Sequence, residues 1–253
     1  MFQTFFTDPL INALVFFYNT IAFQDFGLAV IFLTLFIRII LFPLFYKSTK
    51  NQILIQRLQP ELTKIQHDHK DNKEKQAQAM MDLYKKHNVN PFAGFLMIFL
   101  QLPVLIAIYN VFLQGFTPEI FNHLYDFISR PEQLNTTLLG LLDLKKSSIV
   151  MVSLAAIAQY LQGYFMMPKA EKGKELSSAE QISKQMMYIG PVLTVVILGN
   201  LPAAIGLYWL ITSIFSVAQQ VYINKTLNIK EERKEHGITQ TKNWRNIRRK
   251  RNG

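Results

Sequence analysis

The sequence predicts an all-α polytopic membrane protein with five transmembrane helices. Half of the 253 residues are hydrophobic, and these residues gather in long runs instead of alternating with polar ones. An α-helix needs about 20 apolar residues to cross the ~30 Å hydrocarbon layer of a bilayer, and five runs come close to that length. The chain contains no cysteine, so neither a disulfide framework nor a lipid-modified cysteine is expected.

The first element, 1–25, is predicted to be an interfacial helix on the outer face. Asp8 and Pro9 favour a helix start, and a helix over 9–22 would be interrupted on its apolar side by Asn12 and Asn19. A sixth crossing by this segment is the alternative. The first twenty residues hold no Lys or Arg, so the positive region of a secretory signal peptide is not expected.

The first span is predicted at 26–46 and carries an arginine, Arg38, near its middle. Arginine stays charged at physiological pH, and a central charge costs at least ~2.5–3.5 kcal/mol on insertion scales. Fifteen Phe, Leu, Ile and Val residues lie in this span, and at ~0.3–0.6 kcal/mol each they favour insertion enough to offset that cost. The five N–H donors of the guanidinium still need partners.

A cytoplasmic helical hairpin is predicted at 47–91. Apolar residues recur at helical spacing on both sides of the polar stretch 69–73, namely Leu54, Leu58, Leu62 and Ile65, then Ala77, Met80, Met81 and Tyr84. The two stripes either cover each other or form a transient surface for a client or partner, for which flexible methionines are suited.

The remaining spans follow in order along the chain. A second span is predicted at 92–113, an outer connection at 114–148, a third span at 149–167 and a cytoplasmic loop at 168–185. The next segment, 186–223, is one largely apolar block of 38 residues, which is too long for one crossing. A turn at 200–202 divides them into a fourth span, 186–200, and a fifth, 203–223, before a basic cytoplasmic tail at 224–253.

The distribution of positive charge predicts the orientation. Segments 47–91, 168–185 and 224–253 hold nine, four and ten Lys or Arg residues, which is 23 of the 27 in the chain. Because cytoplasmic loops are enriched in positive charge, we expect the amino terminus outside and the carboxyl terminus in the cytoplasm.

The sequence offers little for catalysis, so we expect no enzyme, no catalytic residues, no cofactor and no metal. All five histidines lie outside the spans, and none has the spacing of a metal site. No span contains Asp or Glu, which disfavours a proton-driven carrier.

Polar uncharged residues at membrane depth are the candidate partners of Arg38. Thr34 shares a helix face with it, and the other spans supply Gln101, Gln159, Gln162, Ser213, Ser216 and Gln219. The simplest arrangement is a wet cavity bounded by several spans. Each glutamine is equally well explained as an interhelical hydrogen bond worth ~0.6 kcal/mol.

The carboxyl tail ends in a basic cluster around an aromatic residue, made of Trp244, Arg245, Arg248, Arg249, Lys250 and Arg251. Such a cluster binds anionic lipid at ~1 kcal/mol per basic residue. It equally suits ribosomal RNA, whose phosphates attract the charges and whose bases stack on Trp244. Both interpretations stay open.

Four stretches closely resemble the YidC/Oxa/Alb membrane protein insertases. They are RIILFPL at 38–44, LQPELTKIQ at 58–66, MMDLYKKHNVNPFAGFLMIFLQLPVLIAIY at 80–109 and PAAIGLYWLITSIFSVAQQ at 202–220, within a resemblance that covers about 9–225. The resemblance implies a five-span core around a hydrophilic groove that opens to the cytoplasm, closes on the outer side and contains the arginine matched by Arg38. It also implies that the hairpin 47–91 receives clients early.

The same resemblance implies a bacterial plasma-membrane protein that inserts nascent membrane proteins, alone or beside the Sec translocon, and functions as a monomer. Ribosomes and anionic lipids are the other expected partners. The large outer domain of Gram-negative members and the lipobox cysteine of many Gram-positive ones are missing, which fits a minimal bacterial member. Prolines expected near the third span are absent, and Thr212 and Ser213 stand near an expected asparagine. The alternatives are a holding chaperone for the Sec translocon without insertase activity, or a small anion carrier or channel, which the absent internal repeat disfavours.

Overall fold

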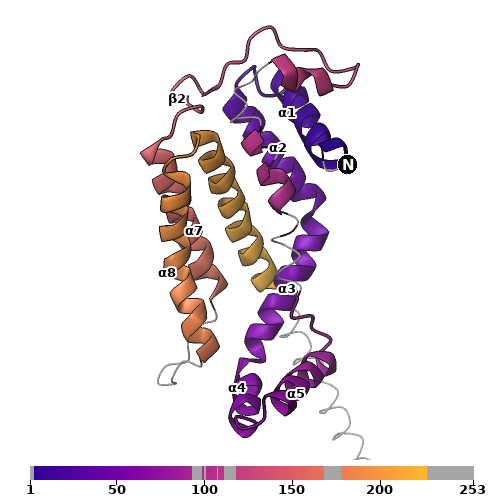
Figure 1. Ribbon diagram of the computed structural model, residues 1–253, viewed down its shortest axis with the longest axis vertical. Helices are drawn as coiled ribbons and strands as arrows, with labels where there is room; N and C mark the ends of the chain where they lie inside the picture. The colour runs from indigo at the N-terminus through magenta and orange to yellow at the C-terminus, as the bar shows by residue number, and fades with distance from the viewer. Residues whose placement is uncertain are drawn as a thin grey trace, which may run out of the picture.

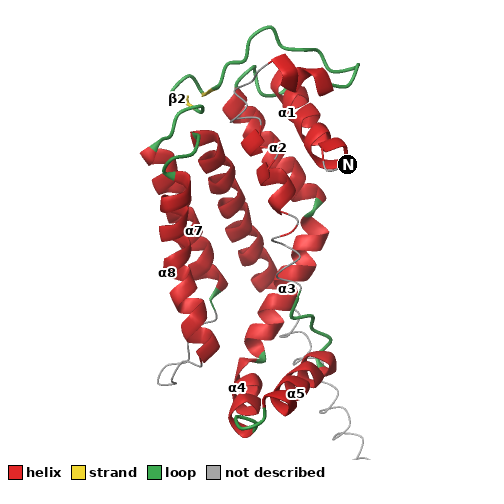
Figure 2. Cartoon of the chain, in the orientation of Figure 1, coloured by secondary structure: helices red, strands yellow, loops and turns green. Residues whose placement is uncertain are grey.

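The computed structural model describes residues 3–92, 99, 101–106, 108–110, 118–167 and 178–226, and helices dominate this part of the chain. Long helices run side by side, and a short helical hairpin extends from one end of the bundle (Figure 1). An irregular connection drawn in green crosses the opposite end (Figure 2). We call these the hairpin end and the strand end, because the second holds two short strands, β1, Thr137–Leu138, and β2, Leu142–Asp143.

The amino-terminal region forms a π-helix, Gln3–Thr7, followed by α1, Asp8–Thr20. Pro9 occupies the first turn of α1, where its missing N–H and fixed φ are tolerated. With 13 residues, α1 is about 20 Å long, which is shorter than the hydrocarbon layer. A tight turn then reverses the chain, so that α1 packs against α2.

The predicted first span consists of two helices, α2, Phe26–Ile40, and α3, Phe42–Arg57, which meet at an angle of 67°. Asp25 caps α2 by accepting a 2.9 Å hydrogen bond from the N–H of Leu28. The segment predicted as the first span, 26–46, is therefore bent, and its role as one span stays a prediction. The bend lies at Leu41, two residues before the Pro43 that occupies the first turn of α3.

The hairpin beyond α3 is formed by α4, Gln59–Asp68, and α5, Lys73–Lys86. Leu58, Leu62, Leu83 and Val89 are buried together between the two arms. The stripes thus cover each other, although Ala77 and Met81 remain exposed. Burial of Tyr84 beside this cluster raises the pKa of its hydroxyl.

Three longer helices and one short one complete the bundle. α7 spans Ile149–Met166 and begins with Ser148, whose hydroxyl accepts from the N–H of Met151. α8 spans Ser178–Leu198 and so begins inside the segment predicted as a cytoplasmic loop. After a break at 199–202 the last helix runs from Ala203 to Thr226, and Gln101–Asn110 forms a short apolar helix.

The strand end is fastened by side chains of α1. Asn12, predicted to interrupt an apolar face, is buried and donates to the carbonyl of His123 at 2.9 Å, and it accepts from the N–H of Tyr125 at 2.7 Å. Asn19 donates to the carbonyl of Ser129. These amides hold the connection that contains the 3₁₀ helix η2, Pro118–His123, and the strands β1, Thr137–Leu138, and β2, Leu142–Asp143.

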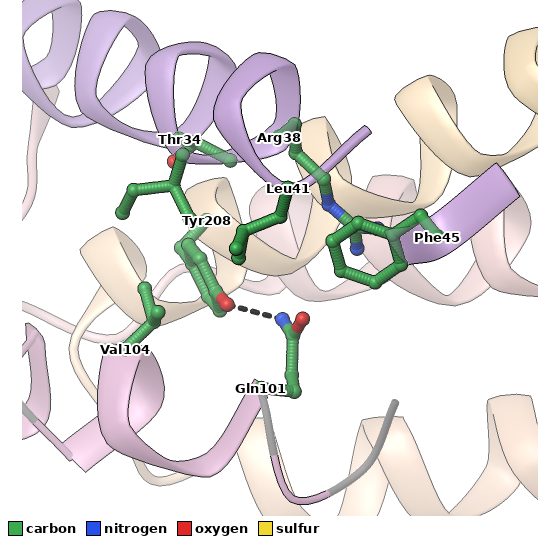
Figure 3. Close-up of a pocket in the computed structure, with 8 residues that line it drawn as sticks. Thr34, Arg38, Leu41, Phe45, Gln101, Val104 and Tyr208 are labelled. Carbon is green, nitrogen blue, oxygen red and sulfur yellow. Dashed lines mark hydrogen bonds between the residues drawn. The ribbon is translucent and has the colours of Figure 1, made fainter. Parts of the chain in front are cut away.

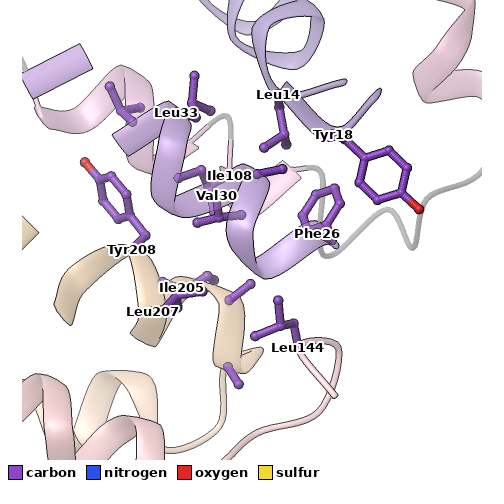
Figure 4. Packing of buried hydrophobic residues seen from close by; sticks show 14 of the residues in the cluster. Leu14, Tyr18, Phe26, Val30, Leu33, Ile108, Leu144, Ile205, Leu207 and Tyr208 are labelled. Atoms are coloured by element: carbon purple, nitrogen blue, oxygen red, sulfur yellow. The ribbon is translucent and has the colours of Figure 1, made fainter. Parts of the chain in front are cut away.

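The main hydrophobic core fills the strand end of the bundle. Its members come from α1, α2, the short helix, the connection and the starts of α7 and the last helix, and Figure 4 labels Leu14, Tyr18, Phe26, Val30, Leu33, Ile108, Leu144, Ile205, Leu207 and Tyr208. The antiparallel pair β1–β2 joins this core through Leu138. The bundle is therefore densely packed at one end, where its loops lie.

Two helices, α7 and the last helix, are long and apolar enough to cross a membrane, and the bent pair α2–α3 is a third candidate. α8 contributes a shorter apolar stretch, Met187–Leu198, and the short helix 101–110 is another. The predicted second span and the loop 168–185 lie partly outside the described residues. The count of five spans stays a prediction.

Candidate functional site

Arg38 lies on the last turn of α2, where the apolar core ends. It is twelve residues from the start of α2 at Phe26, so about 18 Å of helix separates it from the strand end. A hydrocarbon layer ~30 Å thick with its boundary at Phe26 would have this charge just beyond its middle, toward the hairpin end. Arg38 as a whole residue is only 6% exposed.

Two aromatic rings contact this buried charge. The Cζ atom of Arg38 lies 4.4 Å from the ring centroid of Phe45 on α3 and 6.0 Å from that of Phe215 on the last helix. Cation–π contacts of this kind are worth about 2 kcal/mol when desolvated. The bend at Leu41 brings Phe45 back over Arg38, since a straight helix would carry the two residues away from each other along its axis.

A pocket opens beside the guanidinium, with an empty volume of about 240 Å³ that includes its mouth. Figure 3 shows its lining, which comes from α2, α3, the short helix and the last helix: Thr34, Ile37, Arg38, Leu41, Phe45, Gln101, Val104 and Tyr208. The Gln101 amide donates a hydrogen bond to the Tyr208 hydroxyl. The Thr34 hydroxyl donates to the carbonyl of Val30 at 2.6 Å, one turn back in its own helix.

No carboxylate in the described part of the chain forms an ion pair with Arg38. The described ion pairs all lie in α4, α5 or the strand end. Aromatic faces contact the guanidinium without accepting hydrogen bonds from its N–H edges in the manner of a carboxylate. The arrangement is therefore suited to attract an anionic group from outside the chain. The described residues contain no group of three or more His, Cys, Asp or Glu that could hold a metal ion.

Three of the predicted site residues, Thr34, Arg38 and Gln101, meet in this pocket. Gln159 lies elsewhere, between α7 and α8, where it accepts a hydrogen bond from the hydroxyl of Thr194. Gln162 is half-buried on α7, one turn nearer the hairpin end.

The predicted residues of the last helix lie from its middle toward the hairpin end. Ser213 is buried, Ser216 donates to the carbonyl of Thr212, and Gln219 is buried with a side-chain nitrogen that has no hydrogen-bond partner within the described residues. Whether these side chains contact a client stays a prediction. The basic cluster at Trp244, Arg245, Arg248, Arg249, Lys250 and Arg251 lies outside the described residues.

Five pocket residues were not predicted, and two of them, Tyr208 and Phe45, contact its polar side chains. Tyr208 is almost fully buried, and its hydroxyl partners Gln101. A tyrosine inside an apolar span is itself a signal, because a buried hydroxyl needs a partner. Phe45 gave no such signal, since it stands among many other apolar residues and its position depends on the bend at Leu41.

Comparisons with known proteins identify relatives over most of the chain. Residues 16–232 match the family described as 60Kd inner membrane protein. A "Membrane protein insertase YidC 2" of Bacillus anthracis is 33% identical over 91% of this chain and 83% of its own length, and a "Membrane protein insertase YidC" of Clostridium tetani is 33% identical over 79% and 82%. The chain spans only 37% of a longer relative from Geotalea daltonii, to which it is 31% identical.

One solved structure, titled "Active YidC insertase crystal structure with the first transmembrane domain resolved", has the same fold. Its TM-score is 0.57 at 22% identity, over 83% of this chain and 45% of the other.

The fold and the pocket define a helical membrane protein that buries a positive charge against aromatic rings in its apolar region. The chain belongs to the 60Kd inner membrane protein family, whose matched members include the YidC proteins named above. This confirms the resemblance found in the sequence.

Proposed function

We propose that this protein is a membrane protein insertase, which moves nascent membrane proteins into the bilayer and helps them to fold. The observation that carries the proposal is the buried charge of Arg38, which faces a pocket, has no carboxylate partner in the described residues and lies below a densely packed core. The proposal is supported by the relatives, which are named as membrane protein insertases.

The mechanism follows from the cost of moving a polar flank through hydrocarbon. A client has an apolar segment with a short, often acidic, flank that must cross. A hydrated groove from the hairpin end to Arg38 shortens the apolar distance, and the guanidinium attracts the flank transiently. The core at the strand end closes the path, so the groove does not become a pore.

Client entry requires movement in the protein, because Arg38 is only 6% exposed in the described conformation. The bend between α2 and α3 allows this movement. A pivot of α3 about Leu41 withdraws Phe45 from the guanidinium and widens the pocket into the groove. The hairpin at the far end of α3, which meets clients first, drives the pivot.

Release into lipid needs no cofactor and no nucleotide, and the protein is not an enzyme. The client moves sideways along the apolar faces of α7 and the last helix, where Ile157, Leu161 and Ile214 are exposed. Burial of its own apolar surface in lipid, at ~25 cal/mol per Å², drives the step.

We place the protein in a bacterial plasma membrane with the strand end and amino terminus outside and the hairpin end and carboxyl terminus in the cytoplasm. The positive charge of 47–91, 168–185 and 224–253 supports this orientation. Nascent chains, the ribosome, anionic lipids and the Sec translocon are the proposed partners of a functional monomer.

Reconstitution of the purified protein alone in liposomes tests the proposal. A single-span client with an acidic flank is synthesised in the presence of these vesicles, and protease protection measures translocation of the flank. We expect protection with the wild-type protein and none in protein-free vesicles. A client that stays soluble but unprotected would instead indicate a holding chaperone, and chloride efflux without client insertion would indicate an anion channel.

A further inference from the structure

The turn between β1 and β2 presents two leucines to the surroundings. The N–H of Leu141 donates to the carbonyl of Leu138 at 3.0 Å, which closes a four-residue turn. Leu139 and Leu141 are 63% and 88% exposed, although Leu138 beside them packs on the core.

This turn has an unfavourable backbone for its sequence. Leu139 has φ +53° and Gly140 has φ +69°, so both central residues are left-handed, as in a type I′ turn. Such turns favour Asn, Asp or Gly at the first central position, and a positive φ in a bulky residue is a genuine outlier. Exposure of the Leu139 side chain to water would provide no contact that offsets this backbone strain.

The strained conformation is held rigidly. The carboxylate of Asp25, which caps α2, accepts a 2.5 Å hydrogen bond from the N–H of Leu139 through its second oxygen. The Thr137 hydroxyl accepts from the N–H of Gly140 at 3.2 Å. The two leucines therefore form a fixed apolar tip at the end of the hairpin.

The tip lies at the level where candidate spans begin. The N–H of Phe26, the first residue of α2, donates to Asn135, two residues before β1. At the start of the last helix, the N–H groups of Ala203 and Ala204 donate to Lys146 and Leu144 just after β2. The hairpin is thus bound to both helix starts, so it lies at the depth where these candidate spans begin.

The neighbouring side chains suit a lipid surface. Lys145 and Lys146 follow the tip, and the ammonium group of Lys146 is highly exposed, although it lies 3.4 Å from Asp143. Phe23, in the turn between α1 and α2, likewise combines a positive φ of +52° with 87% exposure. Apolar tips next to basic residues bind where acyl chains meet phosphate headgroups.

We propose that Leu139 and Leu141 insert into the lipid leaflet at the strand end and anchor this end of the bundle at a fixed depth. The occupant of the tip is lipid, at the boundary between headgroups and acyl chains. The inference depends on the membrane location of the protein and not on its insertase activity, so either can fail without the other.

Site-specific labelling tests this directly, because the chain has no cysteine. Leu141→Cys is labelled with an environment-sensitive fluorophore in liposomes of mixed zwitterionic and anionic lipid. Glu132→Cys, an exposed position on the same connection, is the matched control. Lipids carrying a spin label near the headgroup quench fluorophores at the boundary, and iodide quenches those in water.

We expect the label at position 141 to be quenched several-fold more by spin-labelled lipid than the label at position 132, with the reverse order for iodide. Equal iodide quenching at both positions would overturn the proposal. A second result would also overturn the proposal. The label at position 141 would not be quenched by lipid in liposomes but would be protected from iodide in native membranes, and the occupant of the tip would then be a protein.

Discussion

The charge of Arg38 can be tested separately from its geometry by comparing Arg38→Lys with Arg38→Ala. At an effective dielectric constant of ~20, two unit charges ~6 Å apart attract by roughly 3 kcal/mol. Loss of that attraction lowers the occupancy of an acidic flank near Arg38 by about 100-fold. Lysine keeps the charge and loses mainly the planar contact with Phe45, which costs on the order of 1 kcal/mol, or about fivefold.

The assay is insertion into liposomes with two clients that differ only in the flank, acidic in one and uncharged in the other. With the acidic client we expect the order wild type, then Arg38→Lys, then Arg38→Ala, with the alanine variant slower than wild type by at least about tenfold. The uncharged client should respond much less to either change. Equal rates for the two variants with the acidic client would refute the reasoning, because charge at this depth would then be dispensable.

Further predictions concern stability and the tail. Asn12→Leu removes the hydrogen bonds to His123 and Tyr125 and should lower the free energy of unfolding by about 2–4 kcal/mol. Thermal unfolding in detergent measures this change. Asn19→Leu removes a hydrogen bond at an exposed position and is the milder control. Gly27→Ala places a Cβ 2.9 Å from the Leu138 Cα atom and should destabilise by ~1–3 kcal/mol. Gly163→Ala should cost less, because its nearest contact is the flexible side chain of Met187 at 3.1 Å and the Met187 Cα atom is 3.6 Å away. An unchanged melting temperature for Gly27→Ala would show that the β1–β2 hairpin does not hold α2. Deletion of 240–253 should weaken ribosome binding and make it less dependent on salt than in the full chain. Insertion of clients already released from the ribosome should be unchanged. If the deleted and full chains bind ribosomes with the same affinity at all salt concentrations, the tail does not contact the ribosome.

Much of the fold could be predicted because apolar runs and their interruptions report membrane helices directly. Arg38 was identified as the central residue because a charge in an apolar span needs a compensating environment. Thr34 followed from helical spacing. The bend at Leu41 could not be predicted, since the apolar run continues across it and Pro43 is equally compatible with the first turn of a new helix or a kink.

Contacts between segments far apart in the chain could not be predicted from the sequence. Asn12 and Asn19 looked like defects in an apolar helix, whereas the structure uses them to bind a connection more than 100 residues away. The pairing of Gln101 with Tyr208 and of Gln159 with Thr194 depends on which helices are neighbours. The hydrophobic periodicity of one helix does not show which other helix packs against it.

The two ends of the bundle differ in how firmly they are held. Near the hairpin end, the Gln56 amide bonds to the carbonyl of Met166 on α7, and Ile53 packs with Ile223 of the last helix. One such hydrogen bond contributes only about 1 kcal/mol, so we expect α3 to separate from its neighbours more easily than the strand end opens. Under the proposed function, the protein would open repeatedly at the end that receives the client and stay closed to ions at the other.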